Sequence, residues 1–122
     1  MGLVAVLDDE KDASRLMQRV IGAMGHEVHA FTDHRDALEW VRGNRPDLAV
    51  IDIKLRRASG LDVLQAIQQM LFSTKVIMIT GCPTEEAVGQ AMKMGVEDCL
   101  SKPLEIAELE ELVARALGKP AR

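Results

Sequence analysis

The chain has little aromatic surface: its 122 residues include two phenylalanines, one tryptophan and no tyrosine. Proteins that bind single-stranded nucleic acid stack the bases on aromatic rings, so this scarcity argues against that class of function. Positive charge is also in short supply, because 15 lysine and arginine residues stand against 19 acidic residues, for a net charge of −4. That balance argues against direct binding of a nucleic-acid backbone.

Cysteine is almost absent. Cys82 and Cys99 have neither C-x-x-C spacing nor a histidine pair beside them, so the sequence supports neither a zinc site nor a thioredoxin-like redox motif. We expect both to be reduced, partly buried thiols.

Long apolar runs are missing as well. The opening run, residues 3–7, is too short to cross a bilayer and lacks the basic flank of a signal peptide. We therefore expect a cytoplasmic protein with no membrane partner. A hydrophobic content of 48% over 122 residues is enough for one core. It predicts a single domain over residues 1–122, with Gly118–Arg122 as a tail or the start of a linker.

Five short apolar runs predict five β-strands, over residues 3–7, 27–31, 48–51, 76–79 and 96–100, and the third run leads directly into Asp52. Between and after these runs, apolar residues recur at the three- and four-residue spacing of amphipathic helices. Glycine and proline indicate where helices end: the first at Gly25, the second at Gly43 with Pro46, and the fifth at Gly118.

The third and fourth helices are expected to lie between the last three strands. The third follows Gly60 and places Leu61, Leu64, Ile67 and Leu71 on its apolar stripe. The fourth begins at Pro83 or Thr84 and ends at Gly95. Its inward-facing residues are expected to be Ala87, Val88, Ala91 and Met92.

Strands that alternate with helices through short loops predict an α/β fold, namely a doubly wound five-stranded parallel sheet with helices on both faces. In such sheets, ligands bind beyond the carboxyl ends of the strands. Asp8 and Asp9 follow the first strand, and Asp52 ends the third. Thr80 ends the fourth strand and Lys102 follows the fifth. We therefore expect these five positions to meet at one edge of the sheet.

Three carboxylates at one edge repel one another unless a cation lies among them, and hard oxygen ligands of this kind suit Mg²⁺. An aspartate carboxylate can also act as a nucleophile toward phosphorus. The transferred phosphoryl group carries negative charge on three oxygens, so it needs a metal, a cationic side chain and a hydrogen-bond donor around it. Lys102 and Thr80 would supply the last two.

Four motifs occur in one order along the chain: Leu7-Asp8-Asp9-Glu10, Asp52 followed eight residues later by Gly60, Thr80-Gly81, and Lys102-Pro103. Together they resemble the receiver domain of bacterial two-component response regulators, over residues 3–117. The resemblance implies a flavodoxin-like strand order, 2-1-3-4-5.

The resemblance also implies roles for the acidic residues. Asp52 is the expected phosphoryl acceptor, in a Mg²⁺-dependent reaction. Asp8 and Asp9 would hold the Mg²⁺ ion together with Asp52, and the backbone carbonyl of Lys54 would be a further metal ligand.

Further implied roles belong to the ends of the fourth and fifth strands. Lys102 would pair with the phosphoryl group or the acceptor carboxylate, and Thr80 would be the switch hydroxyl that moves toward the phosphoryl group. The Lys102-Pro103 peptide bond would be cis.

The sequence departs from the family pattern at three positions. Cys99 stands where the family usually has an aromatic switch residue, Arg56 where a proline is common, and Leu104 where phenylalanine is more common. A cysteine has no ring to bury, so we expect the switch to depend mainly on Thr80 and the loop that follows it.

By this resemblance, the phosphodonor is a histidine kinase or a histidine phosphotransfer protein, and the output is a protein partner or a downstream domain. The face formed by the fourth helix, fifth strand and fifth helix is a candidate homodimer surface. Lys54, Arg56 and Arg57 form a basic loop that is either solvated or in contact with the donor.

Two other functions stay open. A phosphatase of the haloacid dehalogenase type also uses an aspartate nucleophile, but its D-x-D motif is missing after the first strand. A receiver-like interaction module that is not phosphorylated is the other alternative.

Overall fold

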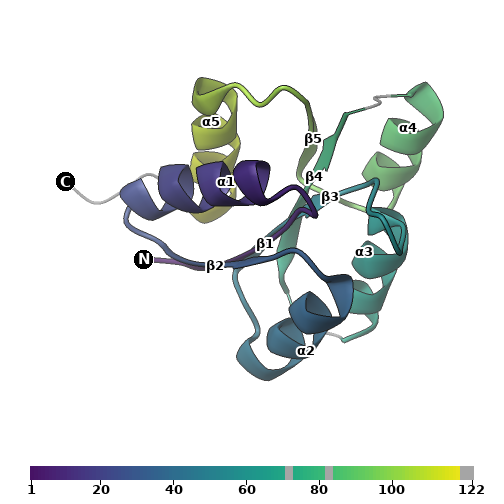
Figure 1. Ribbon diagram of the computed structural model, residues 1–122, viewed down its shortest axis with the longest axis horizontal. Coiled ribbons are helices and arrows are strands. Elements are labelled where there is room, and N and C mark those ends of the chain that lie inside the picture. The colour runs from purple at the N-terminus through teal and green to yellow at the C-terminus, as the bar shows by residue number, and fades with distance from the viewer. Residues whose placement is uncertain (71–72, 82–83, 119–122) are drawn as a thin grey trace.

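The computed structural model describes residues 1–70, 73–81 and 84–118, and in this part of the chain strands and helices alternate throughout (Figure 1). The five strands pair in parallel in the order β2-β1-β3-β4-β5, as predicted. The strands are β1 (Leu3–Leu7), β2 (Glu27–Phe31), β3 (Leu48–Asp52), β4 (Lys75–Thr80) and β5 (Asp98–Ser101). The helices are α1 (Lys11–Ala23), α2 (His34–Asn44), α3 (Gly60–Gln69), α4 (Glu85–Lys93) and α5 (Ile106–Leu117).

Two apolar layers hold the helices against the sheet. On one face, α1 and α5 pack on alternate strand residues such as Val4, Val6 and Val50. On the other face, α2, α3 and α4 pack on the residues between them, such as Leu7 and Ile51. Strand residues alternate between the faces with a period of two, so apolar runs without polar interruption are what a sheet covered on both sides requires.

Short polar side chains begin three of the helices. The Asp33 carboxylate accepts a hydrogen bond from the Arg35 amide, and the Ser59 hydroxyl accepts one from the Leu61 amide. The Thr84 hydroxyl caps α4 by accepting from the Ala87 amide. These caps satisfy amides that have no partner inside the helix.

The structure corrects three details of the sequence analysis. Gly43 does not end α2, which continues to Asn44 and turns at Arg45, a residue with a φ of 46°. Strand β5 begins at Asp98 rather than at Val96, because the Val96 amide bonds back to the Ala91 carbonyl and closes the end of α4. The third correction concerns Met92, whose side chain was expected to face inward.

Met92 is 46% exposed. Helix α4 is short and fully buries only Ala91, while Met94, just beyond its end, packs on the core. One step of about 100° along the helix therefore turns Met92 away from the core. Leu71, Cys82, Pro83 and the tail after Gly118 lie outside the described residues.

No helix in the described ranges is both long enough and apolar enough to span a lipid bilayer.

Candidate functional site

The polar residues that the sequence placed at strand ends do meet at one edge of the sheet. Asp8 directly follows β1, and Asp52 is the last residue of the neighbouring strand β3. The chain then enters helices on opposite faces, α1 after β1 and α3 after β3. This is the topological switch point, where a crevice opens beyond the carboxyl ends of the strands. Thr80 and Lys102 complete the edge from β4 and β5.

Asp8, Asp9 and Asp52 form a tight acidic cluster. One carboxylate oxygen from each lies within 4.8 Å of the other two. Asp8 is fully buried and Asp52 nearly so, whereas Asp9 is partly exposed. Burial raises the pKa of Asp8, and the nearby charge of Asp52 adds to this effect, although the Glu10 amide and Lys102 act in the opposite direction.

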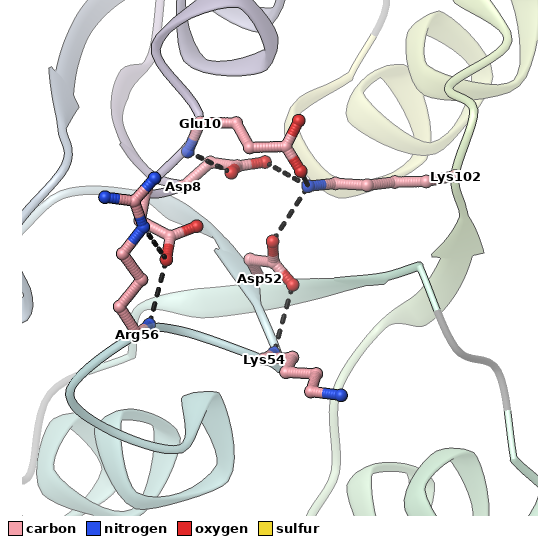
Figure 2. A network of polar contacts seen from close by, with 7 residues as sticks. Asp8, Glu10, Asp52, Lys54, Arg56 and Lys102 are labelled. Carbon is pink, nitrogen blue, oxygen red and sulfur yellow. Dashed lines mark hydrogen bonds and ion pairs between the residues drawn. The ribbon is translucent and has the colours of Figure 1, made fainter.

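Lys102 is the cation at the centre of this cluster (Figure 2). Its Nζ lies 2.9 Å from Asp8 Oδ2, 2.9 Å from Asp52 Oδ2 and 3.2 Å from Glu10 Oε1. Burial disfavours the charge of Lys102, but the hydrogen bonds to Asp52 and Asp8 outweigh burial and raise its pKa. The lysine therefore stays protonated at neutral pH.

Main-chain amides fix the orientation of all three aspartates. The Glu10 amide donates to Asp8 Oδ1 at 2.9 Å, and the Lys54 amide donates to Asp52 Oδ1 at 3.0 Å. The Arg56 amide donates to Asp9 Oδ2 at 2.8 Å. These hydrogen bonds fix the directions of the carboxylate oxygens, so the loops after β1 and β3 hold the oxygens ready for a cation.

At Gly60 the loop after Asp52 folds back against the end of β3, where there is no room for a side chain. A Cβ atom at this position would lie 2.2 Å from the Asp52 carbonyl oxygen and 2.6 Å from Ile53 Cα. The loop returns tightly, because the Gly60 amide donates to the Ile53 carbonyl at 2.6 Å and Lys54 pairs with Ser59. Only glycine lets the backbone approach this closely.

Thr80 is buried at the end of β4, and its carbonyl accepts the Lys102 amide at 2.8 Å. Thr80 also lines a cavity of about 320 Å³, together with residues of the loop after β3 and Ala87 of α4. The Lys102-Pro103 peptide bond is cis, the geometry that the family resemblance implied.

Cys99 lies on β5 opposite Met78 of β4 and is half-buried. Burial raises the pKa of its thiol, with the charge of Asp98 adding to this effect, so the thiol is protonated at neutral pH. Cys82 is among the residues that the structure leaves undescribed.

From the sequence, Glu10 had no predicted role, and Arg56 was expected only as part of a basic loop that is solvated or contacts the donor. Glu10 was quoted only as part of a motif, yet its carboxylate pairs with Lys102. Arg56 was noted as a departure from a pattern, and it contacts Asp9 through both its amide and its guanidinium group. Glu10 could have been found from its position directly after the acidic pair, whereas Arg56 carried no such signal.

The donor set suits a hard divalent cation. Mg²⁺ prefers carboxylate oxygens and keeps several water ligands. The cluster offers three such carboxylates, and four acidic groups outnumber the two cations that contact them. A divalent cation would relieve this imbalance.

Comparison with known proteins gives one consistent family. Residues 4–114 match the response regulator receiver domain family. Response regulator protein PilR of Pseudomonas aeruginosa is 37% identical over 112 residues, which cover 92% of this chain and 25% of that protein. The Regulator of RpoS from Escherichia coli is 30% identical over 115 residues, which cover 93% of this chain and 34% of that protein. The chain therefore spans only about a quarter to a third of these relatives.

Solved structures agree with this result. A response regulator receiver domain protein from Clostridium thermocellum has a TM-score of 0.89 at 25% identity, and the match covers 96% of this chain and 94% of that one. NtrX from Brucella abortus has a TM-score of 0.88 at 30% identity, covering 95% of this chain and 27% of that one. The chain belongs to the family of response regulator receiver domains, the signalling modules of two-component systems.

Proposed function

We propose that this domain accepts a phosphoryl group on Asp52, in a Mg²⁺-dependent reaction, from a histidine kinase or a histidine phosphotransfer protein. One observation carries the proposal. The carboxylate of Asp52 lies at the switch point of the sheet, with Lys102 Nζ 2.9 Å from one oxygen and two further carboxylates close by. This arrangement surrounds one nucleophilic oxygen with the groups that phosphoryl transfer requires.

The reaction would form one bond and break one. An Asp52 carboxylate oxygen attacks phosphorus, and the bond from phosphorus to the donor's histidine nitrogen breaks. The electron pair stays on that nitrogen, which takes up a proton, and Asp52 becomes an acyl phosphate. Lys102 is placed to balance the negative charge of the phosphoryl oxygens.

The metal ligands in this proposal are the carboxylates of Asp8, Asp9 and Asp52 and the backbone carbonyl of Lys54. When bound, Mg²⁺ would neutralise charge on the phosphoryl oxygens. The amides that hold the three carboxylates keep these ligands in place before the ion arrives.

The family match favours neither alternative function, the phosphatase or the module without phosphorylation. Because the relatives are longer than this chain, we also propose that residues 1–122 act as one receiver domain that controls an output domain or a separate partner. The setting would be the cytoplasm, and self-association would use the face formed by α4, β5 and α5.

The acceptor assignment is tested by intact-mass measurement after incubation with a small-molecule phosphodonor and Mg²⁺. We expect one added phosphoryl group on the wild type and none on Asp52→Asn. Asp62→Asn is the matched control, because Asp62 is an exposed carboxylate in the first turn of α3, and it should be labelled like the wild type. Equal labelling of Asp52→Asn and the wild type would contradict the proposal.

The switch would depend on Thr80 rather than on Cys99. Thr80 is buried beside the loop that follows the acceptor, so a phosphoryl group on Asp52 can attract its hydroxyl. A cysteine on β5 has little surface to rearrange.

Amide hydrogen exchange with and without phosphodonor tests this switch. Thr80→Ala should accept phosphate but lose the phosphorylation-dependent change in α4 and β5, and Cys99→Ala should keep it. Equal loss in the two variants, with folding intact, would show that Cys99 is part of the switch.

A further inference from the structure

Arg56 contacts the acidic cluster from the side opposite to Lys102 (Figure 2). Its amide donates to Asp9 Oδ2 at 2.8 Å, and its guanidinium Nε lies 3.8 Å from the same oxygen. The first contact is a hydrogen bond, and the second is an ion pair without hydrogen-bond geometry. One residue therefore both orients Asp9 and balances its charge.

The two cations of the site divide the acidic groups between them. Lys102 contacts Asp8, Glu10 and Asp52, and Arg56 contacts Asp9. The Arg56 side chain is 83% exposed, compared with 17% for Lys102. The Arg56 charge is already hydrated, so its side chain can leave Asp9 with little change in solvation, whereas Lys102 is held in a mostly buried position against three carboxylates.

We propose that Arg56 sets the affinity of the site for Mg²⁺. In the metal-free protein its guanidinium group pairs with the Asp9 carboxylate and so competes with the ion. Its amide keeps the same carboxylate oriented. This inference rests on the proposed function, because it takes Asp9 as a metal ligand. It assigns Arg56 as a positioning residue rather than a member of the reacting groups.

The physical argument is electrostatic. A dication that binds Asp9 repels a guanidinium group held next to the same carboxylate, so part of the binding free energy is lost unless the side chain moves away. Because Arg56 is exposed, solvent and salt screen this repulsion, and its effect on Mg²⁺ affinity should be modest, about two- to five-fold at low ionic strength.

The orienting contact is separable from the charge. Any residue except proline retains the amide that donates to Asp9, so Arg56→Ala removes only the guanidinium group. Arg56→Pro removes both the charge and the donor. It should therefore bind Mg²⁺ less tightly than Arg56→Ala does, because Asp9 loses the hydrogen bond that fixes its carboxylate.

Arg57 provides a matched control in the same loop. Arg57 lines a cavity of about 300 Å³ together with Asp9 and Arg56. Within the described ranges it makes no hydrogen bond or ion pair. Arg57→Ala removes an equal charge from the loop without touching the carboxylate, so it separates a specific contact from a general change in net charge.

The experiment is a calorimetric Mg²⁺ titration of the full 122-residue chain at low and at high salt, for the wild type and four variants. We expect Arg56→Ala to bind Mg²⁺ about two- to five-fold more tightly at low salt, with the difference shrinking at high salt. Arg56→Lys should restore wild-type affinity, Arg57→Ala should change it little, and Arg56→Pro should fall below Arg56→Ala. Thermal unfolding without metal checks that each variant folds.

Equal Mg²⁺ affinity for Arg56→Ala and Arg57→Ala, or a gain in Arg56→Ala that salt does not reduce, would overturn the inference and leave the proposed metal site intact. Failure of the wild type to bind Mg²⁺ would instead overturn the proposed function, and this inference with it.

Discussion

The two ends of the sheet differ in how closely they bring like charges together. At the amino ends of the strands, side chains pair with main-chain groups. Asp47 accepts the Leu3 amide at 2.8 Å, His26 accepts the Gly2 amide at 2.9 Å, and Lys75 donates to the Ala116 carbonyl at 3.0 Å. At the carboxyl ends, the carboxylates gather against one another within 4.8 Å.

The difference shows which end is organised for folding and which for chemistry. At the amino end, hydrogen bonds between side chains and main-chain groups stabilise the fold and bring no like charges together. The carboxyl end keeps Asp8 and Asp52 buried beside each other, an arrangement that costs stability in the absence of a metal. Three pairs of substitutions test this contrast, in order of expected effect.

The largest effect on stability is expected at Gly60, where the loop at the carboxyl end of β3 has no room for a side chain. Gly60→Ala places Cβ 2.2 Å from the Asp52 carbonyl oxygen, so the loop must shift and the free energy of unfolding should fall by about 3 kcal/mol. Gly22→Ala, in α1 with open space around it, should raise it by about 0.5 kcal/mol. Urea denaturation measures both. A tolerated Gly60→Ala would show that the loop adapts.

Lysine substitutions at the two ends should differ in how much they change the free energy of unfolding and in whether Mg²⁺ reverses the change. Lys102→Met leaves Asp8 and Asp52 without their shared cation, and should lower the free energy of unfolding by about 2 kcal/mol at neutral pH. Added Mg²⁺ should recover much of this loss. Lys75→Met, which removes an exposed lysine from the amino end, should change it by less than about 0.5 kcal/mol.

Chemical denaturation with and without Mg²⁺ checks this pair. If the two methionine variants lose equal stability without metal, Lys102 is not compensating buried charge.

Of the two aspartate substitutions, only the one at the carboxyl end should raise the stability of the metal-free protein. Asp8→Asn keeps the acceptor for the Glu10 amide but removes a buried charge, so the metal-free protein should gain about 1 kcal/mol at neutral pH. Asp47→Asn, at an exposed position of the amino end, should stay within about 0.5 kcal/mol of the wild type. Asp8→Asn should also bind Mg²⁺ more weakly, which a titration with the ion would show.

The pH dependence follows from the raised pKa of Asp8 in the folded state. The folded protein holds this proton more tightly than the unfolded chain does. The wild type therefore loses stability as pH rises from the unfolded pKa through the folded pKa, and Asp8→Asn should lack this loss. An Asp8→Asn protein whose stability follows the wild-type pH curve would contradict the assignment.

The fold followed from the sequence because its signals are local. Apolar runs and helical stripes placed ten elements, and the alternation of strands with helices fixed a parallel sheet. The meeting of Asp8, Asp52, Thr80 and Lys102 then followed from topology, because the carboxyl ends of parallel strands share one edge. The functional roles of these residues stay predictions.

What the sequence could not supply depends on contacts between distant residues. The hydrogen bond from Arg56 to Asp9 joins positions 47 residues apart through the shape of a loop, and no local pattern encodes it. The exposure of Met92 depends on how the short helix α4 sits on the sheet. Similarly, the start of β5 was misjudged because Val96 is buried like a strand residue but bonds to the end of a helix.

The central claim is that Asp52 alone carries the phosphoryl group, and locating the modified residue tests it most directly. The wild type is incubated with a phosphodonor and Mg²⁺, the acyl phosphate is reduced with borohydride to homoserine, and the digested peptides are sequenced by mass spectrometry. We predict homoserine at position 52 and unmodified aspartate at positions 8 and 9. Homoserine at position 8 or 9, or no modification of any aspartate, would contradict the account.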